Sequence, residues 1–292
     1  MRILTYVTTQ QDEGRAVRSV VPRRFQLGEH AFRRLKVQQA ILLDGQAVRA
    51  DHIVHAGQTL QIRLANGAET AAGAAPAPMI RYMDEDMLIV CKDAPLATLP
   101  GAHTGSDTLR ERLALALGED PQTFCYHPVN RLDKGTSGLL CVARHAHAQR
   151  LLAAQLHTGS FVREYLAVAE GIPQTPCGTI DAPIAHLGAG ARRVVREDGQ
   201  HAVTHYRVER TSGGRALLRL RLETGRTHQI RVHLCSIGCP IVGDYLYGEP
   251  CPALGGRFAL HSAFLACTQP LTGASIALEE PLPQALAALL KP

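Results

Sequence analysis

The stretch "HPVNRLDKGTSGLLCVAR", residues His127 to Arg144, combines a charged loop with an apolar run. Asp133 lies between Arg131 and Lys134, and the flexible segment Gly135 to Gly138 follows. Residues 139–143 are apolar enough for a buried strand. The pattern therefore predicts that Asp133 sits on a loop directly before a buried strand. A catalytic loop and an ordinary structural turn both fit this pattern.

The flanking sequence predicts further strands and a few helices. Apolar spacing after Arg144 predicts a helix that stops at Gly159, and a second helix is expected to begin at a Thr227 cap. Strands are predicted at residues 80–83, 88–91, 163–171, 202–210 and 215–225. In the last strand Ala216, Leu218, Leu220 and Leu222 alternate with Leu217, Arg219 and Arg221. The expected fold class is α+β, with a mainly antiparallel sheet and flanking helices.

Length and charge indicate two domains. A chain of 292 residues exceeds the usual size of a single core. Residues 65–79 are rich in Ala, Gly and Pro without apolar periodicity, as linkers are. Residues 1–66 carry ten Lys/Arg and five Asp/Glu, so they hold the whole formal excess of +5. We predict domains at 1–66 and 79–292, with a linker at 67–78.

The segment before the linker predicts a small α/β module. A short basic helix at 32–39 leads to a strand at 41–43, an Asp44-Gly45 hairpin turn and a strand at 60–64. This order resembles the alpha-L RNA-binding domain over roughly residues 15–64. The resemblance implies that Arg23, Arg24, Arg33, Arg34 and Lys36 contact RNA phosphates without reading sequence. The alternative is a solvated helix face.

Several classes of protein and of site are not expected. The apolar runs are too short for a bilayer span and the N-terminus does not resemble a signal peptide, so we expect a cytoplasmic protein. The eight cysteines form no Cys-x-x-Cys pair and are expected to be reduced. Cys235, Cys239, Cys251 and His261 lack the paired spacing of structural zinc sites, so no metal is predicted.

The second domain resembles a known enzyme family. The motifs "NRLDKGTSGLL", "REYLAVAEG", "GRTHQIRVHL" and "GCPIVGDYLYG" follow in the order and spacing of the RluA family of pseudouridine synthases. The similarity extends over about residues 79–290. It implies a pseudouridine synthase fold with a central cleft and the isomerisation of uridine to pseudouridine in RNA without a cofactor.

The resemblance also implies roles for individual residues. Asp133 matches the catalytic aspartate, and Arg231 matches the arginine that pairs with it, so two segments 98 residues apart should meet. Tyr165 matches the aromatic residue that packs on the target base, and Ile230 matches an apolar pocket wall. Arg131 matches the residue that fills the gap left by the flipped nucleotide. In the basic hairpin at 188–200, Arg192, Arg193 and Arg196 are candidate phosphate contacts, with a solvated loop as the alternative.

The chemistry agrees with a single carboxylate. A hydrolase acting at the bond between base and sugar normally uses two carboxylates, whereas an isomerase must keep water out. We therefore expect Asp133 to be buried, in a dry, arginine-lined pocket. It could attack the sugar carbon, attack the pyrimidine ring or remove a sugar proton, and the sequence does not choose among these. Asn130 and Gly135 depart from residues that are common in the family.

Two other functions remain open at this stage. One is a non-catalytic RNA-binding or ribosome-assembly protein on the same scaffold, and the other is a nucleoside hydrolase. The expected partner is RNA, either large-subunit ribosomal RNA or transfer RNA. We expect no DNA, no membrane and a monomer.

Overall fold

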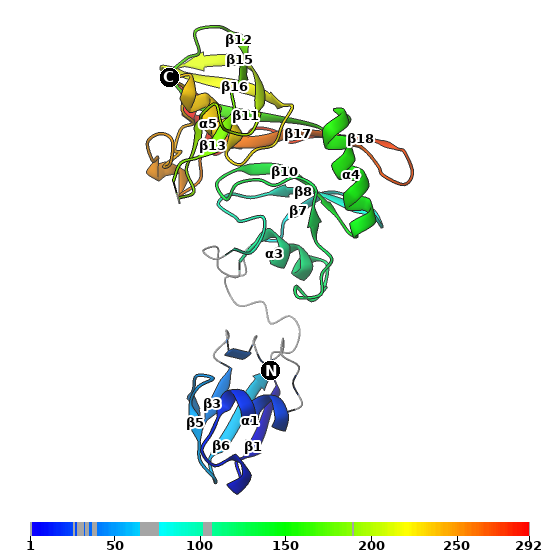
Figure 1. The fold of residues 1–292 in the computed structure, drawn as a ribbon, viewed down its shortest axis with the longest axis vertical. Coiled ribbons are helices and arrows are strands. Elements are labelled where there is room, and N and C mark those ends of the chain that lie inside the picture. The colour runs from blue at the N-terminus through cyan, green and yellow to red at the C-terminus, as the bar shows by residue number, and fades with distance from the viewer. Residues whose placement is uncertain are drawn as a thin grey trace. The chain divides into compact units, whose positions relative to one another are not determined.

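The computed structural model describes residues 2–25, 27, 32, 35–36, 40–64, 76–101, 107–188 and 190–291. The chain divides into two compact units, Met1–Ala75 and Pro76–Pro292 (Figure 1). Each unit has its own cluster of buried apolar side chains, as an independent domain requires. Most of the predicted linker at 67–78 lies outside the described residues.

The unit Met1–Ala75 contains a four-stranded sheet in the order β1-β6-β3-β4. These strands are β1 (Arg2–Val7), β6 (Thr59–Leu64), β3 (Ile41–Leu43) and β4 (Gln46–Ala47), and a separate pair joins β2 (Arg15–Ala16) to β5 (Ile53–Val54). Asp44 and Gly45 have φ angles of 51° and 82°, the geometry of a tight hairpin turn. The predicted turn is therefore confirmed.

The sequence patterns give no prediction for helix α1 (Val17–Arg24). Pro22 lies inside this helix and Val17, Val20 and Val21 are β-branched, so intrinsic propensity argues against it. The three valines are nevertheless spaced at i, i+3 and i+4 and are fully buried in the core of this unit. Tertiary packing therefore outweighs propensity here. Of the predicted helix at 32–39, only Phe32, Leu35 and Lys36 are described, and all three are helical.

The unit Pro76–Pro292 is organised around a ten-stranded sheet. Along its main path lie β12 (Cys177–Asp181), β15 (Val203–Ser212), β16 (Arg215–Leu222), β11 (Val162–Glu170), β17 (Leu260–Thr268), β10 (Ser137–Ala143), β8 (Met87–Lys92) and β7 (Met79–Met83). In addition, β18 (Ser275–Glu279) pairs with β17, and β9 (His127–Pro128) pairs with β10. The β10–β17 pairing is parallel and the other pairings in this sheet are antiparallel. The predicted α+β fold class is confirmed.

Helices and a small hairpin flank this sheet (Figure 1). They are α3 (Leu109–Ala116), α4 (Ala146–Thr158), α5 (Gln229–Ser236), α6 (Gln284–Ala287) and the pair β13 (Ile184–His186) and β14 (Arg193–Val195). Helix α4 ends at Gly159, whose φ of 75° is left-handed, as predicted. Helix α5 begins at Gln229 after His228, so the prediction of a Thr227 cap is wrong.

Strands β8 and β10 are buried on both faces, because their neighbouring residues point to opposite sides of the sheet. One set of side chains, Leu88, Val90, Leu140 and Val142, packs in the main core with Leu109 and Leu113 of α3. The other set, Met87, Ile89, Leu139 and Cys141, packs with Ala148 and Leu152 of α4. The two helices therefore cover opposite faces, and the loop before β10 starts from a rigid support.

The parallel contact between β10 and β17 fixes where that loop ends. Gly138 pairs with Ser262, and a Cβ atom at Gly138 would lie 2.2 Å from the Ser262 carbonyl oxygen. Gly138 also has a φ of +105°, which favours glycine. The glycine at the end of the charged loop thus permits the close approach of the two strands.

Candidate active site

A pocket of about 760 Å³ opens beside the loop that carries Asp133. Its walls come mainly from segments far apart in sequence: residues 97–100, residues 128–134 with Thr136, Arg163 and Tyr165 of β11, and residues 222–231. Asp133, Arg231, Tyr165, Arg131 and Ile230 all line it. The structure therefore brings together the residues that sequence reasoning assigned to the reaction, while their roles stay predictions.

The Asp133 side chain contacts Arg231 directly. Nη1 of Arg231 donates a hydrogen bond of 2.9 Å to Oδ2 of Asp133, so the predicted meeting of the two distant segments is confirmed. Nε and Nη2 of Arg231 donate to both carboxylate oxygens of Asp244, at 2.7 and 2.8 Å. Arg231 is thus shared between a pocket carboxylate and a second, fully buried carboxylate. The bidentate pair fixes the plane of the guanidinium and leaves one edge for Asp133.

Two aromatic rings hold the Arg231 guanidinium. Its central carbon lies 4.2 Å from the ring centre of Phe258 and 5.0 Å from that of Tyr247. Burial opposes charge on Arg231, but hydrogen bonds and the charges of Asp244 and Asp133 raise its pKa above the ordinary value. The guanidinium is therefore permanently charged and rigidly placed.

Gly135 makes room for this arrangement. A Cβ atom at Gly135 would lie 2.5 Å from Cε1 of Phe258, closer than real contacts allow. A side chain at this position would need a different placement of the ring. Gly135 thus has a packing reason, because Phe258 lies against both Gly135 and Arg231.

Asp133 is less enclosed than the sequence led us to expect. Its side chain is 29% exposed, whereas Arg231 and Asp244 are 3% and 0% exposed. The expectation of a buried carboxylate in a dry pocket is therefore wrong for this structure. The reason is geometric: Asp133 lies on the open side of the guanidinium, and the pocket in front of it is open.

The other predicted pocket residues differ in burial. Tyr165 and Ile230 are 4% and 5% exposed and belong to the main core, although both border the pocket. Burial raises the pKa of Tyr165, and the Asp133 charge acts in the same direction, so its hydroxyl stays protonated. Arg131 is exposed and has no hydrogen-bond or ion-pair partner among the described residues. Its side chain is available for contact with a ligand.

Sequence reasoning missed Arg163, which is 7% exposed and lines the pocket. Its Nε is buried without a hydrogen-bond partner in the described part of the chain. Leaving a buried charged donor unpaired is costly. The Arg163 guanidinium thus borders the pocket without a hydrogen-bond or ion-pair partner among the described residues.

Lys92 supports the same site from behind and was also missed. It is fully buried, and its Nζ donates hydrogen bonds to the carbonyls of Asp93 and Leu96 at 2.9 and 2.7 Å. A longer contact of 3.5 Å reaches the carbonyl of Lys134, next to Asp133. Lys92 therefore joins the loop after β8 to the loop that holds the carboxylate.

Sequence reasoning also did not single out Asp244, Tyr247 and His228, although the quoted motifs contain all three. Asp244 and Tyr247 belong to the quoted segment "GDYLYG", where a spacing of three residues forms a turn closed by the Tyr247 N–H to the Asp244 carbonyl at 3.3 Å. His228 precedes Arg231 by three residues in "THQIR". No local pattern shows that these segments converge on Asp133, since that depends on the sheet.

The basic hairpin β13–β14 is joined to the site through Tyr247, whose hydroxyl accepts a hydrogen bond of 2.8 Å from the Arg193 N–H. Arg193 donates from Nη1 to His186 at 2.7 Å, and Arg196 is paired with Asp198. Arg192 is exposed, with its guanidinium carbon 5.9 Å from the Tyr247 ring centre. Of the three predicted phosphate contacts, Arg192 is the one without a hydrogen-bond partner among the described residues.

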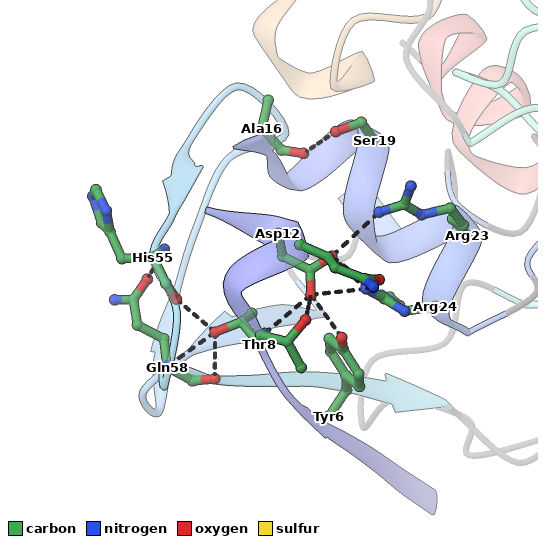
Figure 2. Close-up of polar contacts among 11 residues, drawn as sticks. Tyr6, Thr8, Asp12, Ala16, Ser19, Arg23, Arg24, His55 and Gln58 are labelled. Carbon is green, nitrogen blue, oxygen red and sulfur yellow. Dashed lines mark hydrogen bonds and ion pairs between the residues drawn. The ribbon is translucent and has the colours of Figure 1, made fainter. Parts of the chain in front are cut away.

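Arg23 and Arg24, two of the predicted RNA-facing arginines, both contact the buried carboxylate of Asp12 (Figure 2). Asp12 is 0% exposed and accepts hydrogen bonds from the Tyr6 hydroxyl, the Thr9 N–H and the Arg24 guanidinium, at 2.6, 3.1 and 3.0 Å. Burial alone would raise the pKa of Asp12, but these donors hold it far below its ordinary value. Arg24 is therefore already paired inside the protein.

The remaining basic residues of that predicted patch differ in how far they are free to contact RNA. Arg23 makes one longer contact of 3.3 Å to Asp12 and keeps 49% of its side chain exposed. Lys36 is exposed, and its Nζ lies 5.2 Å from the centre of the Phe32 ring. The predictions for Arg33 and Arg34 fall outside the described residues.

Comparison with known proteins identifies the second unit. A family model described as RNA pseudouridylate synthase matches residues 86–236. Ribosomal large subunit pseudouridine synthase D of Xanthomonas campestris pv. campestris is 38% identical over 267 residues, which cover 85% of this chain and 80% of that protein. The chain belongs to the RluA family of RNA pseudouridine synthases. It is therefore an isomerase that converts uridine in RNA to pseudouridine.

Other members of the family agree. The protein of the same name from Pseudomonas aeruginosa is 36% identical over 266 residues, covering 84% of this chain and 81% of that one. Among solved structures, human RNA Pseudouridylate Synthase Domain Containing 1 has a TM-score of 0.58 and 26% identity, covering 70% of this chain and 83% of that chain. Membership of this family sets aside the readings as a non-catalytic RNA-binding protein and as a nucleoside hydrolase.

Three further observations concern other kinds of site. All eight cysteines are free thiols. Within the described ranges, His, Cys, Asp and Glu side chains form no group that could hold a metal ion. No helix in the same ranges is both long and apolar enough to cross a membrane.

Proposed function

We propose that this enzyme modifies uridines in large-subunit ribosomal RNA, with Asp133 as the catalytic carboxylate. The proposal on the substrate is supported by relatives whose names specify the ribosomal large subunit. The proposal on chemistry is supported mainly by the contact of 2.9 Å between Arg231 and Asp133 at the wall of a pocket. A guanidinium in this position favours the ionised carboxylate, which the reaction needs.

The oxygen atoms of Asp133 are not equivalent. The contact with Arg231 and the approach of His228 Nε2 at 3.9 Å both involve Oδ2. Oδ1 has no hydrogen-bond partner within the described residues and is the oxygen that we assign to the reaction. Attack on the sugar carbon, attack on the ring and removal of a sugar proton all need such a free oxygen.

Isomerisation breaks the bond between N1 of uracil and C1′ of ribose and forms a bond between C5 and C1′. One proton leaves C5 and one proton is gained at N1, so no atom is gained or lost. The other carboxylate that Arg231 contacts, Asp244, is bound at both oxygens and is 0% exposed. It cannot activate water, which agrees with an isomerase rather than a hydrolase.

Base flipping would bring the uridine to this pocket. A nucleotide within a helix must leave its stack before a side chain in a pocket can reach the sugar, at a cost of a few kcal/mol. We propose that Arg131 fills the gap, because it is exposed and lacks a protein partner in the described residues. Tyr165 and Ile230 would then contact the flipped base, and Arg163 would meet its phosphate or carbonyl oxygens.

The first unit is proposed to bind the phosphate backbone of RNA. Arg23 and Lys36 are the members of the predicted patch that the structure describes as exposed, while Arg24 supports Arg23 from inside through Asp12. Positive side chains of this kind contribute sequence-independent affinity. Sequence and target choice would then belong to the pocket of the second unit.

Mapping of pseudouridines in cells tests the proposed target. Pseudouridines are mapped in ribosomal RNA and in transfer RNA from cells that lack the gene. The large-subunit ribosomal RNA should lose pseudouridine at one or more positions. Wild-type protein should restore the loss, and an Asp133→Asn variant should not. A loss confined to transfer RNA would overturn the proposed substrate while leaving the enzyme class intact.

A further inference from the structure

His228 connects the pocket to the basic hairpin. It is the residue before α5, and its φ of 60° is the left-handed region that few non-glycine residues adopt. Its ring borders the pocket and its side chain is 14% exposed. Nε2 lies 3.9 Å from Oδ2 of Asp133, too far for a hydrogen bond between them. The ring nitrogen therefore faces the place where a base would lie beside the carboxylate.

The hydrogen bonds of Tyr247 define the tautomer of His228. The backbone N–H of Arg193 donates to the Tyr247 hydroxyl oxygen at 2.8 Å, and this contact can run in one direction only. The same hydroxyl lies 2.9 Å from Nδ1 of His228. No other acceptor for the hydroxyl hydrogen is found among the described residues, so that hydrogen points to Nδ1. A neutral His228 then carries its own hydrogen on Nε2.

The surroundings keep the ring neutral. Burial lowers the pKa of His228, and the positive charges of Arg231 and Arg193 act in the same direction. The carboxylates of Asp133 and Asp244 act in the opposite direction but do not outweigh these effects. A neutral ring offers an N–H donor without forming an ion pair that would occupy Asp133.

We propose that His228 is a further catalytic residue, whose Nε2–H donates a hydrogen bond to a carbonyl oxygen of uracil while the glycosidic bond breaks. This inference rests on the proposed function of the pocket. When the bond between N1 and C1′ breaks, its electron pair goes to the base, and negative charge spreads onto the carbonyl oxygens. If Asp133 instead first adds to the pyrimidine ring, negative charge also reaches a carbonyl oxygen. His228 keeps its proton throughout, so the donor fits all three routes and the atom balance is unchanged.

A pair of amide variants separates this role from a purely structural one. Gln places its side-chain amide nitrogen near the position of Nε2, whereas Asn places it near the position of Nδ1. The left-handed backbone at residue 228 favours Asn and Gly over Gln. A donor role predicts more activity in His228→Gln, while a backbone role predicts more activity in His228→Asn and His228→Gly.

Single-turnover rates on a transcript of large-subunit ribosomal RNA give the comparison. We expect His228→Asn and His228→Gly to lose about 10²-fold in rate, as removal of one such donor does elsewhere, with RNA affinity unchanged. His228→Gln should recover at least about tenfold relative to His228→Asn, since it restores a donor. Thermal unfolding checks that each variant is folded. Equal or higher activity in the Asn or Gly variant would overturn the proposal.

Tyr247 provides a second test that does not depend on turnover. Nitrogen NMR of the labelled full-length protein should show His228 as the Nε2–H tautomer, and Tyr247→Phe should shift it toward a mixture. The Nδ1–H tautomer in the wild type would overturn the proposal whether or not ribosomal RNA is the substrate. The proposed function can also fail by itself. If Asp133→Asn remained active, the proposed role of Asp133 would be wrong, and the tautomer of His228 could still be measured.

Discussion

At the scale of single residues, the site depends on how one guanidinium is divided between two carboxylates. Asp244 takes two donors of Arg231 and is fully buried, whereas Asp133 takes one and faces the pocket. An arginine bound by Asp133 alone could turn its fork and occupy both oxygens of the proposed catalytic carboxylate. Asp244 therefore keeps one oxygen of Asp133 available.

Replacement of Asp244 tests this division. Asp244→Asn leaves the buried guanidinium with one charged partner, so the free energy of unfolding should fall by about 3 kcal/mol. Turnover should also fall at temperatures where the variant is folded, because Arg231 can then bind both oxygens of Asp133. Urea unfolding and single-turnover rates provide the measurements. A folded Asp244→Asn enzyme with wild-type turnover would contradict this division of Arg231 between the two carboxylates. Asp181→Asn, which removes an exposed carboxylate, serves as control.

Arg163 tests whether the pocket holds an anionic ligand. Its guanidinium lines the pocket and has no hydrogen-bond or ion-pair partner among the described residues, so we expect bound RNA to contact it. Arg163→Met should therefore raise KM for RNA by about tenfold or more, equivalent to a lost charged hydrogen bond of about 1.5–3 kcal/mol, with a smaller effect on kcat. Arg207→Met removes an arginine that is 68% exposed and should leave KM unchanged. An Arg163→Met variant with wild-type KM would show that the guanidinium serves packing only.

At the scale of elements, local patterns predict β7, β8, β10, β11, β15, β16 and α4, whereas β1, β12, β17 and β18 were not predicted. On β16 Ala216, Leu218 and Leu220 are fully buried, as the alternation predicts, whereas Leu222 at the end of the strand is only partly buried. The patterns fail at α1, where packing overrides valine and proline, and at the start of α5, where His228 replaces the expected Thr227 cap. The partners of Arg231 depend on contacts across the sheet, which no local period encodes.

Lys92 makes the junction of two loops sensitive to pH. Burial lowers its pKa to about 7, against the opposing charges of Asp133 and Asp93. An unfolded lysine titrates near 10.5, so between these values the unfolded chain binds more protons than the folded one. The free energy of unfolding should therefore rise with pH in this window, by up to about 2 kcal/mol between pH 7 and pH 9.

Denaturant unfolding of Lys92→Met at the two pH values isolates this contribution, because methionine does not titrate. The free energy of unfolding of the wild type, relative to that of Lys92→Met, should be higher at pH 9 than at pH 7. Lys291→Met, which removes an exposed lysine, controls for loss of a lysine charge at a position without such burial. A difference that stays constant from pH 7 to pH 9 would contradict the account of Lys92.

At the scale of the whole molecule, the proposed function assigns RNA binding to the first compact unit and chemistry to the second. Residues 1–66 carry the whole formal excess of positive charge in the sequence, and the second unit carries the pocket. Sequence alone suggested this division through composition and charge. The internal pairing of Arg24 with Asp12 could not be read from composition, because it depends on how η1 (Gln10–Asp12) packs beside α1.

Removal of residues 1–66 should weaken RNA binding and flatten its dependence on salt, because phosphate contacts release counterions. Affinity of the full chain and of the shortened chain is measured at several salt concentrations on the same transcript. Arg23→Gln in the full chain should reduce the salt slope by about 1 if it contacts one phosphate. Unchanged affinity and slope on removal of the whole segment would contradict an RNA-binding role for the first unit.

The most direct test of the central claim is product formation by Asp133→Asn on an RNA that the wild type modifies. Nucleosides from digested RNA are separated and pseudouridine is quantified, with RNA affinity measured in parallel. Glu249→Gln, which removes an exposed carboxylate, is the control. The account predicts no detectable pseudouridine from Asp133→Asn, with folding and RNA affinity retained and full activity in the control. Pseudouridine formed by a folded Asp133→Asn enzyme would contradict it.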